Sequence, residues 1–222
     1  MFQGFNEETV AFLWGVRFNN EKSWFQQNKP SYVKNVYEPM KALAFETFDA
    51  LHARFPDQEL MCKVSRIYRD ARRLYGRGPY KDNLWFCIRR GGEDWVEKPT
   101  FWFELMPEGY SWGMGFYTTK AATMERFRKE LDEHPERFRP LAEQAARLSR
   151  FTLTGEEYAR KKGDPGGALS AWYNRKHFSM ERSVPYDELS FSPDLRQELV
   201  EGFSELMPLY QYFDLFCARG EG

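Results

Sequence analysis

Apolar residues recur at helical spacing through the first part of the chain. Asn6 is placed to cap a first helix, and Pro30 and Pro39 are each placed to begin a further helix at its first turn. The apolar face of the first helix is Val10, Leu13, Trp14 and Phe18. The apolar face of the helix after Pro39 is Met40, Leu43, Ala44, Phe48, Leu51 and Phe55. Residues 1–56 are therefore predicted to be mainly helical.

The next part of the chain alternates between apolar and polar residues, which is typical of β-strands. We expect strands at residues 60–68, 83–90, 100–106 and 110–117. Between the last two, Pro107 and Gly109 stand at the second and fourth positions of a tight turn, so these strands should form a hairpin. Residues 57–120 are therefore predicted to form a sheet.

Helical spacing returns after the hairpin, and residues 121–149 are predicted to be helical. Residues 150–222 are predicted to be mixed, with strands at 151–154 and 177–184 and a final helix that Ser192 caps and Pro208 kinks or restarts. This order predicts an α+β protein, with an antiparallel sheet packed against N-terminal, central and C-terminal helices. Because no convincing linker interrupts the chain, residues 1–222 are predicted to form a single domain.

Composition favours a soluble, folded, cytoplasmic protein. Of the 222 residues, 42% are hydrophobic, and the 29% that are charged nearly balance, to a net charge of −1. The three cysteines lack CxxC spacing and indicate free thiols in a reducing compartment. We see no signal-peptide pattern and no apolar run long enough to cross a membrane. The three histidines lack metal-ligand spacing and no Walker loop is present, so we expect no metal site and no cofactor.

Charge is concentrated in residues 63–90, here called the basic stretch. It holds nine Lys and Arg residues against two acids, Asp70 and Asp82, and therefore carries +7. Because the whole chain carries −1, the remaining residues sum to −8. The stretch joins two predicted strands and contains Gly76, Gly78 and Pro79. We take it as the candidate functional site.

Arginines in the basic stretch have the spacing of an anion site. If Asp70 opens a helical turn, Arg69, Arg72 and Arg73 share one surface at positions i, i+3 and i+4. Guanidinium groups that converge in this way bind phosphate or carboxylate in a bidentate manner. Backbone N–H groups near the glycines and the ammonium of Lys81 would add to such a site. The predicted ligand-binding residues are Arg66, Arg69, Asp70, Arg72, Arg77, Tyr80 and Lys81.

Other interpretations of the basic stretch stay open. The arginines could be structural and pair with acidic neighbours such as Glu7, Glu8 or Glu104. The stretch could also belong to a non-enzymatic interaction module that docks an acidic protein or a nucleic acid, because aromatic residues permit base stacking. These aromatic residues are Tyr68, Tyr75, Tyr80 and Trp85. The sequence does not decide whether the protein is an enzyme.

The same residues resemble a known family. Arg66, Arg69, Asp70 and Arg72, followed by Pro79-Tyr80, are similar to the pattern of the uncharacterised, mainly bacterial domain of unknown function 2461. The family pattern has Phe where this chain has Arg73 and Lys where it has Arg77. The run from Asn19-Asn20 to Trp24-Phe25, with Tyr32 and Pro39, also resembles family members. The resemblance implies no activity, because the family has no settled one.

Overall fold

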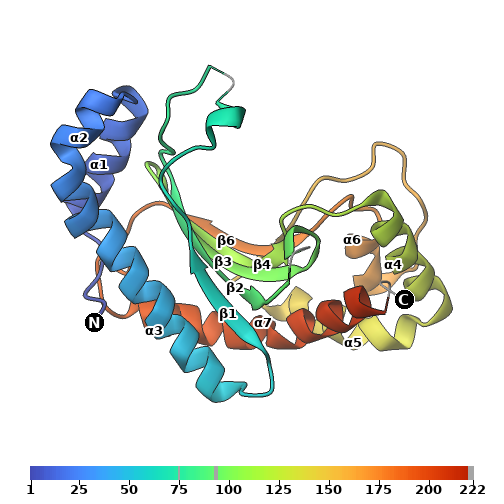
Figure 1. Ribbon diagram of the computed structural model, residues 1–222. Coiled ribbons are helices and arrows are strands. Elements are labelled where there is room, and N and C mark those ends of the chain that lie inside the picture. The colour runs from blue at the N-terminus through green and yellow to red at the C-terminus, as the bar shows by residue number, and fades with distance from the viewer. Residues whose placement is uncertain (75, 93–94, 220–222) are drawn as a thin grey trace. The chain divides into compact units, whose positions relative to one another are not determined.

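The computed structural model describes residues 1–74, 76–92 and 95–219, apart from the side chains of Arg73 and Trp95. It confirms the α+β class (Figure 1). The six strands form one antiparallel sheet in the order β1-β2-β3-β4-β6-β5. Their bounds are Leu60–Val64 (β1), Leu84–Arg90 (β2), Pro99–Met106 (β3), Gly109–Phe116 (β4), Thr152–Thr154 (β5) and Ser179–Val184 (β6). The predicted hairpin is confirmed, since β3 and β4 flank Pro107 and Glu108.

The N-terminal helices begin at a capping box. α1 (Glu7–Phe18) is capped by Asn6, whose side chain accepts a hydrogen bond from the N–H of Thr9, as the sequence predicted. α2 (Lys22–Ser31) contains Pro30 in its interior and continues through a π-helical segment, Tyr32–Tyr37, into α3 (Glu38–Arg54). The prediction that Pro30 begins a new helix was therefore wrong.

The remaining helices follow the sheet hairpin. α4 (Ala121–Glu133) and α5 (Pro135–Arg147) lie within residues 121–149, which were predicted to be helical, and α6 is short (Ser170–Tyr173). α7 (Leu195–Ala218) passes through Pro208, so the chain does not restart there. Every helix in the described ranges is too short or too polar to span a lipid bilayer.

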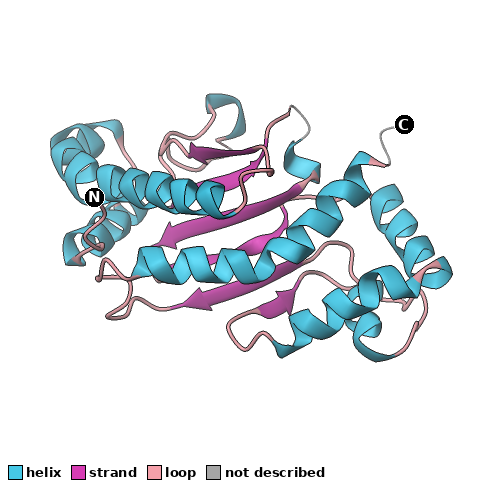
Figure 2. Cartoon of the chain, turned by 90° about the horizontal axis from the view of Figure 1, so that it is seen from below, coloured by secondary structure: helices cyan, strands magenta, loops and turns pink. Residues whose placement is uncertain are grey.

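The chain divides into two compact units, each made of three segments. Unit 1 consists of Met1–Ile88, Trp102–Trp112 and Ser183–Glu201. In unit 1, α3 lies along β1 in both views (Figures 1 and 2). The ring of Phe103 packs against Phe5, Phe86 and Tyr110 in the core of this unit. These buried aromatic rings support the strands from which the candidate site projects.

Unit 2 consists of Arg89–Phe101, Gly113–Arg182 and Gly202–Gly222. Its core is organised around Phe213 of α7, whose ring contacts Phe116, Phe127 and Phe178. Phe127 of α4 also meets Phe138 of α5, with ring centroids 5.1 Å apart. The assignment of residues 1–222 to one domain stays a prediction.

Candidate functional site

Residues 65–83, here called the arginine loop, connect β1 to β2 in unit 1 (Figure 1). The two arms of the loop pair with each other beyond the end of β1. Tyr68 and Tyr80 form an antiparallel bridge, and the N–H of Arg69 donates to the carbonyl of Pro79 at 2.8 Å. The N–H of Lys81 donates to the carbonyl of Ile67 at 2.7 Å. The predicted strand at residues 60–68 thus ends at Val64 as a regular strand and continues only as this isolated pairing.

The pairing contains a bulge in the second arm, opposite Arg66. On one side of Arg66, the N–H of Ser65 donates to the carbonyl of Trp85 at 2.7 Å. On the other side, Ile67 is bonded to Lys81. Arg66 alone therefore lies opposite three residues, 82–84, so the second arm must bow outward. Two of the three bulged residues bond to other segments: Asp82 accepts from Arg17, and Asn83 donates to Glu104.

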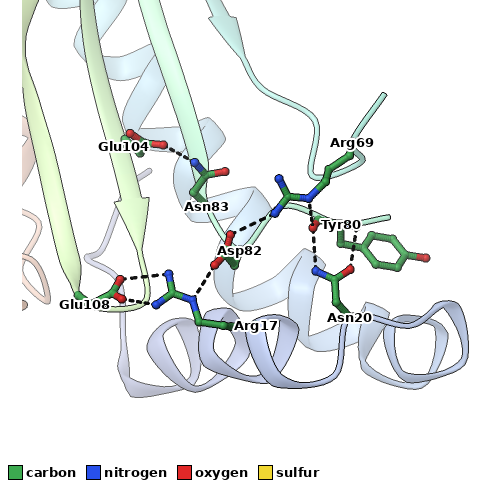
Figure 3. Close-up of polar contacts among 8 residues, drawn as sticks. All are labelled: Arg17, Asn20, Arg69, Tyr80, Asp82, Asn83, Glu104 and Glu108. Atoms are coloured by element: carbon green, nitrogen blue, oxygen red, sulfur yellow. Dashed lines mark hydrogen bonds and ion pairs between the residues drawn. The ribbon is translucent and has the colours of Figure 1, made fainter. Parts of the chain in front are cut away.

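Asn20, two residues before the first residue of α2, holds the second arm of the loop in place (Figure 3). Its amide N–H donates to the carbonyl of Tyr80, and its amide oxygen accepts from the N–H of Tyr80, both at 2.9 Å. Gly78 makes this approach possible, because a Cβ atom there would lie 2.3 Å from the Asn20 side-chain oxygen. The side chain of Asn20 thus substitutes for a neighbouring strand.

The ring of Tyr80 lies in the core of unit 1. The residue is 3% exposed, and its ring stacks on Phe25 with centroids 4.1 Å apart. Tyr68 lies at the edge of the same aromatic cluster and is 51% exposed. Of the residues predicted to bind a ligand, Tyr80 is therefore the one whose side chain is used for packing.

Arg69 is held in place by two bonds (Figure 3). Its Nε donates to the Tyr80 carbonyl at 2.8 Å, and its terminal nitrogen lies 3.4 Å from Asp82. The second oxygen of Asp82 accepts from Nε of Arg17 at 2.6 Å, and Arg17 also pairs with Glu108. Asp82 thus bridges two guanidinium groups. Hydrogen bonds to Glu108 and Asp82 raise the pKa of Arg17, and the bond from Arg17 lowers the pKa of Glu108.

Asp70 and Arg72 form a local pair that does not include Arg69. Asp70 caps a short 3-10 helix, Ala71–Arg73, by accepting from the N–H of Arg72 at 3.0 Å. The same carboxylate accepts from the guanidinium of Arg72, whose side chain is 87% exposed. The expected shared surface at i, i+3 and i+4 requires α-helical spacing, and this single 3-10 turn does not provide it. The side chain of Arg73, predicted to share this surface, lies outside the described part of the structure. Tyr75, one of the aromatic residues predicted to permit base stacking, lies outside the described residues.

The other predicted cations have different surroundings. Arg66 and Arg77 are exposed, and neither guanidinium has a hydrogen bond or ion pair with any described residue. Lys81 is half-buried, with its Nζ 5.4 Å from the centre of the Trp85 ring, and no described side chain forms an ion pair with it. Burial lowers the pKa of Lys81 to about 8; the charges of Arg69 and Arg66 act in the same direction, and Glu104 acts against them. Arg66, Arg69 and Lys81 are here called the cation cluster.

Comparison with known families gives a match over nearly the whole chain. The family model described as conserved hypothetical protein (DUF2461) matches residues 8–212. The chain belongs to the DUF2461 family. A search of curated proteins found no match.

In this DUF2461 chain, several residues of the family resemblance fasten the arginine loop. Asn20 and Arg69 bond to the backbone of Tyr80, while Phe25 and Tyr32 pack in the aromatic cluster around it. Trp24 lies against Gly15, where a Cβ atom would be 2.5 Å from its ring. The described residues contain no group of three or more His, Cys, Asp or Glu side chains that could hold a metal ion.

Three residues of the site were missed by sequence reasoning or given another role. Arg17 and Glu108 were not predicted as site residues. Arg17 lies 65 residues before its partner Asp82 and 91 residues before its partner Glu108. No local pattern connects positions so far apart. Glu104, named as a partner for the arginines, accepts a hydrogen bond from Asn83. In the structure, the acids that pair with Arg69 and Arg72 come from the loop itself.

Proposed function

We propose that this protein binds an anionic small molecule, bearing phosphate or carboxylate, at the cation cluster. One observation carries the proposal. The charges of Arg66 and Arg69 both act on Lys81, and neither Arg66 nor Lys81 forms an ion pair with a described residue. Holding like charges together costs free energy, and charges arranged in this way are common at functional sites. An anion would neutralise the cluster.

Geometry favours Arg66 and Arg69 as the primary contacts. Arg66 is exposed, and the side chain of Arg69 is 19% exposed, with its Nε already fixed on the Tyr80 carbonyl. Because the guanidinium of Arg69 is already fixed, it can accept a planar oxyanion with little further loss of side-chain entropy. Arg72 and Arg77 lie on the exposed part of the loop, where their charges would attract an anion over a longer range, and Asp70 orients Arg72.

A small ligand suits the cluster better than a nucleic acid. The cluster contains three cations, whereas the chain outside the basic stretch carries −8 in total and would repel an extended polyanion. The proposal also places the protein in the cytoplasm, where the free thiols of Cys62, Cys87 and Cys217 would remain reduced.

A thermal-shift screen of nucleotides, sugar phosphates and small carboxylates tests the proposal. A ligand that binds only the folded protein raises its melting midpoint, and the rise grows with the logarithm of the ligand concentration above the dissociation constant. We expect at least one class of small anion to do so. If no small anion shifts the midpoint, while polyanions bind with an affinity that grows with length and falls steeply with salt, the interaction-module alternative is correct.

A further inference from the structure

Lys81 has surroundings that differ from those of an ordinary anion-binding lysine. Its ammonium is half-buried against the face of Trp85 and has no ion-pair partner in the described ranges. Its neighbours are two guanidiniums, Arg69 and Arg66, and one carboxylate, Glu104. Burial and the two arginines oppose protonation, while Glu104 favours it, and the result is a pKa of about 8.

The backbone holds this amine in place. The N–H of Lys81 is bonded to Ile67, and the preceding residue, Tyr80, is bonded on both of its backbone groups. The guanidiniums of Arg69 and Arg66 lie close enough for their charges to act on this amine, and Arg69 is fixed on the carbonyl of Tyr80, the residue before Lys81. A lysine next to cationic groups and shielded from water is a known way to obtain a nucleophilic amine at neutral pH.

We propose that Lys81 is a nucleophile that forms an imine with the carbonyl group of a small oxo acid, whose carboxylate is held by Arg66 and Arg69. This inference deepens the proposed function and rests on it for the binding of the carboxylate. It names the class of ligand, an anion that carries an aldehyde or ketone, and it makes the cluster a reactive site.

The chemistry needs no oxidant or metal. The lone pair of the neutral Nζ attacks the carbonyl carbon, a C–N bond forms, and the carbonyl oxygen takes up a proton to give a carbinolamine. Loss of that hydroxyl group with a proton, as water, leaves the C=N bond. The two hydrogens of the amine thus leave in the water together with the carbonyl oxygen. Arg66 and Arg69 keep the carboxylate away from the amine and direct the carbonyl carbon toward it.

Trapping with borohydride tests this inference on the intact wild-type protein. The probes are glyoxylate, an anionic aldehyde, and glycolaldehyde, a neutral one, and labelled lysines are identified by peptide mass spectrometry. At a pH of about 7.5, we expect glyoxylate to label Lys81 at least about tenfold faster than the exposed Lys63, because a pKa of about 8 leaves a larger neutral fraction. Arg66→Gln should lower the ratio of the glyoxylate rate to the glycolaldehyde rate at Lys81.

Binding of glycolate, which has the carboxylate but no carbonyl, separates the two proposals. If glycolate binds and Lys81 is labelled no faster than Lys63, the nucleophile is wrong and anion binding stands. If both probes label Lys81 and Arg66→Gln does not change the ratio of the glyoxylate rate to the glycolaldehyde rate, Arg66 does not hold the carboxylate, and the assignment of the ligand as an oxo acid is wrong. If neither glycolate nor inorganic phosphate binds and Lys81 is not labelled, both proposals fail.

Discussion

The side chain of Asn20 makes the two backbone hydrogen bonds that a neighbouring β-strand would otherwise make to Tyr80. The amide group of asparagine carries one donor and one acceptor in nearly the arrangement of a peptide group, so it satisfies the N–H and the carbonyl of Tyr80 together. Arg69 adds a second donor to the same carbonyl. The position of the loop therefore depends on one side chain that is 60 residues away in sequence.

We expect Asn20→Leu to destabilise the protein by about 1–3 kcal/mol, because the N–H of Tyr80 then loses its partner in a poorly solvated place. Denaturant unfolding measures the change. Asn19→Leu is the matched control, because Asn19 is exposed and its side chain makes one hydrogen bond, to the carbonyl of Gly15. This substitution should change the free energy of unfolding by no more than about 0.5 kcal/mol. Equal effects at the two positions would contradict the role assigned to Asn20.

The buried charge of Lys81 lowers the free energy of unfolding at neutral pH. In the unfolded chain its pKa is the ordinary 10.5, and in the folded protein it is about 8. Below about pH 8, Lys81 is protonated in both the folded and the unfolded state, and the full free-energy cost of burying its charge is present. Between about pH 8 and pH 10.5, Lys81 is protonated mainly in the unfolded state, so the free energy of unfolding rises with pH.

Lys81→Met should therefore stabilise the protein at neutral pH, by about 1 kcal/mol once the exposed part of the side chain is allowed for. The gain over wild type should shrink as the pH rises through the window from about 8 to 10.5. Unfolding curves of the two proteins across this range provide the measurement. Lys63→Met, at an exposed position in β1, controls for the loss of charge. A gain that does not change with pH would show that the folded and unfolded pKa values are alike.

At the scale of elements, α2, the π-helical segment and α3 form one continuous helical stretch from Lys22 to Arg54. The wider π turn also leaves the carbonyl of Asn35 able to accept a bond from the hydroxyl of Thr9, at 2.6 Å. This bond ties the stretch to α1. The extra residue of the π turn sets which faces of α2 and α3 meet the rest of unit 1.

Deletion of Lys34, an exposed residue of the π-helical segment, tests that role. Returning the segment to α-helical spacing rotates α2 by about 100° relative to α3 and moves Phe25 away from Tyr80. We expect a loss of more than about 3 kcal/mol, or failure to fold, whereas Lys34→Ala should be nearly neutral. Circular dichroism during thermal unfolding distinguishes them. A deletion variant as stable as Lys34→Ala would show that the π turn is incidental.

Element prediction succeeded where the signal was periodic and failed where it depended on proline or on distant partners. Alternation along 100–106 and 110–117 located β3 and β4 to within a residue. Pro30 was expected to begin a helix but lies inside α2, and α7 continues through Pro208 without a restart, because tertiary packing outweighs one missing hydrogen bond in each helix. The pairing of the loop arms could not be predicted, because it depends on Asn20, and the Arg17–Asp82 ion pair joins positions that share no local pattern.

At the scale of the whole molecule, charge is distributed unevenly along the chain. The basic stretch carries +7 and everything outside it carries −8. This asymmetry was evident from the sequence, and it identified the loop that contains the cation cluster. The sequence did not indicate which arginines the fold neutralises. Arg69 and Arg72 are paired with acids of the same loop, whereas Arg66 and Lys81 have no ion pair with a described residue.

Calorimetric titration of oxalate and of inorganic phosphate into three proteins tests anion binding at the cation cluster most directly. The three proteins are wild type, Arg66→Gln and Lys63→Gln; both variants lose one positive charge, and only Arg66 belongs to the cluster. We expect wild type and Lys63→Gln to bind one of these anions alike, and Arg66→Gln to bind it about tenfold more weakly, a loss of about 1.4 kcal/mol. Equal affinity in all three proteins, or no binding of either anion to wild type, would contradict the proposed site.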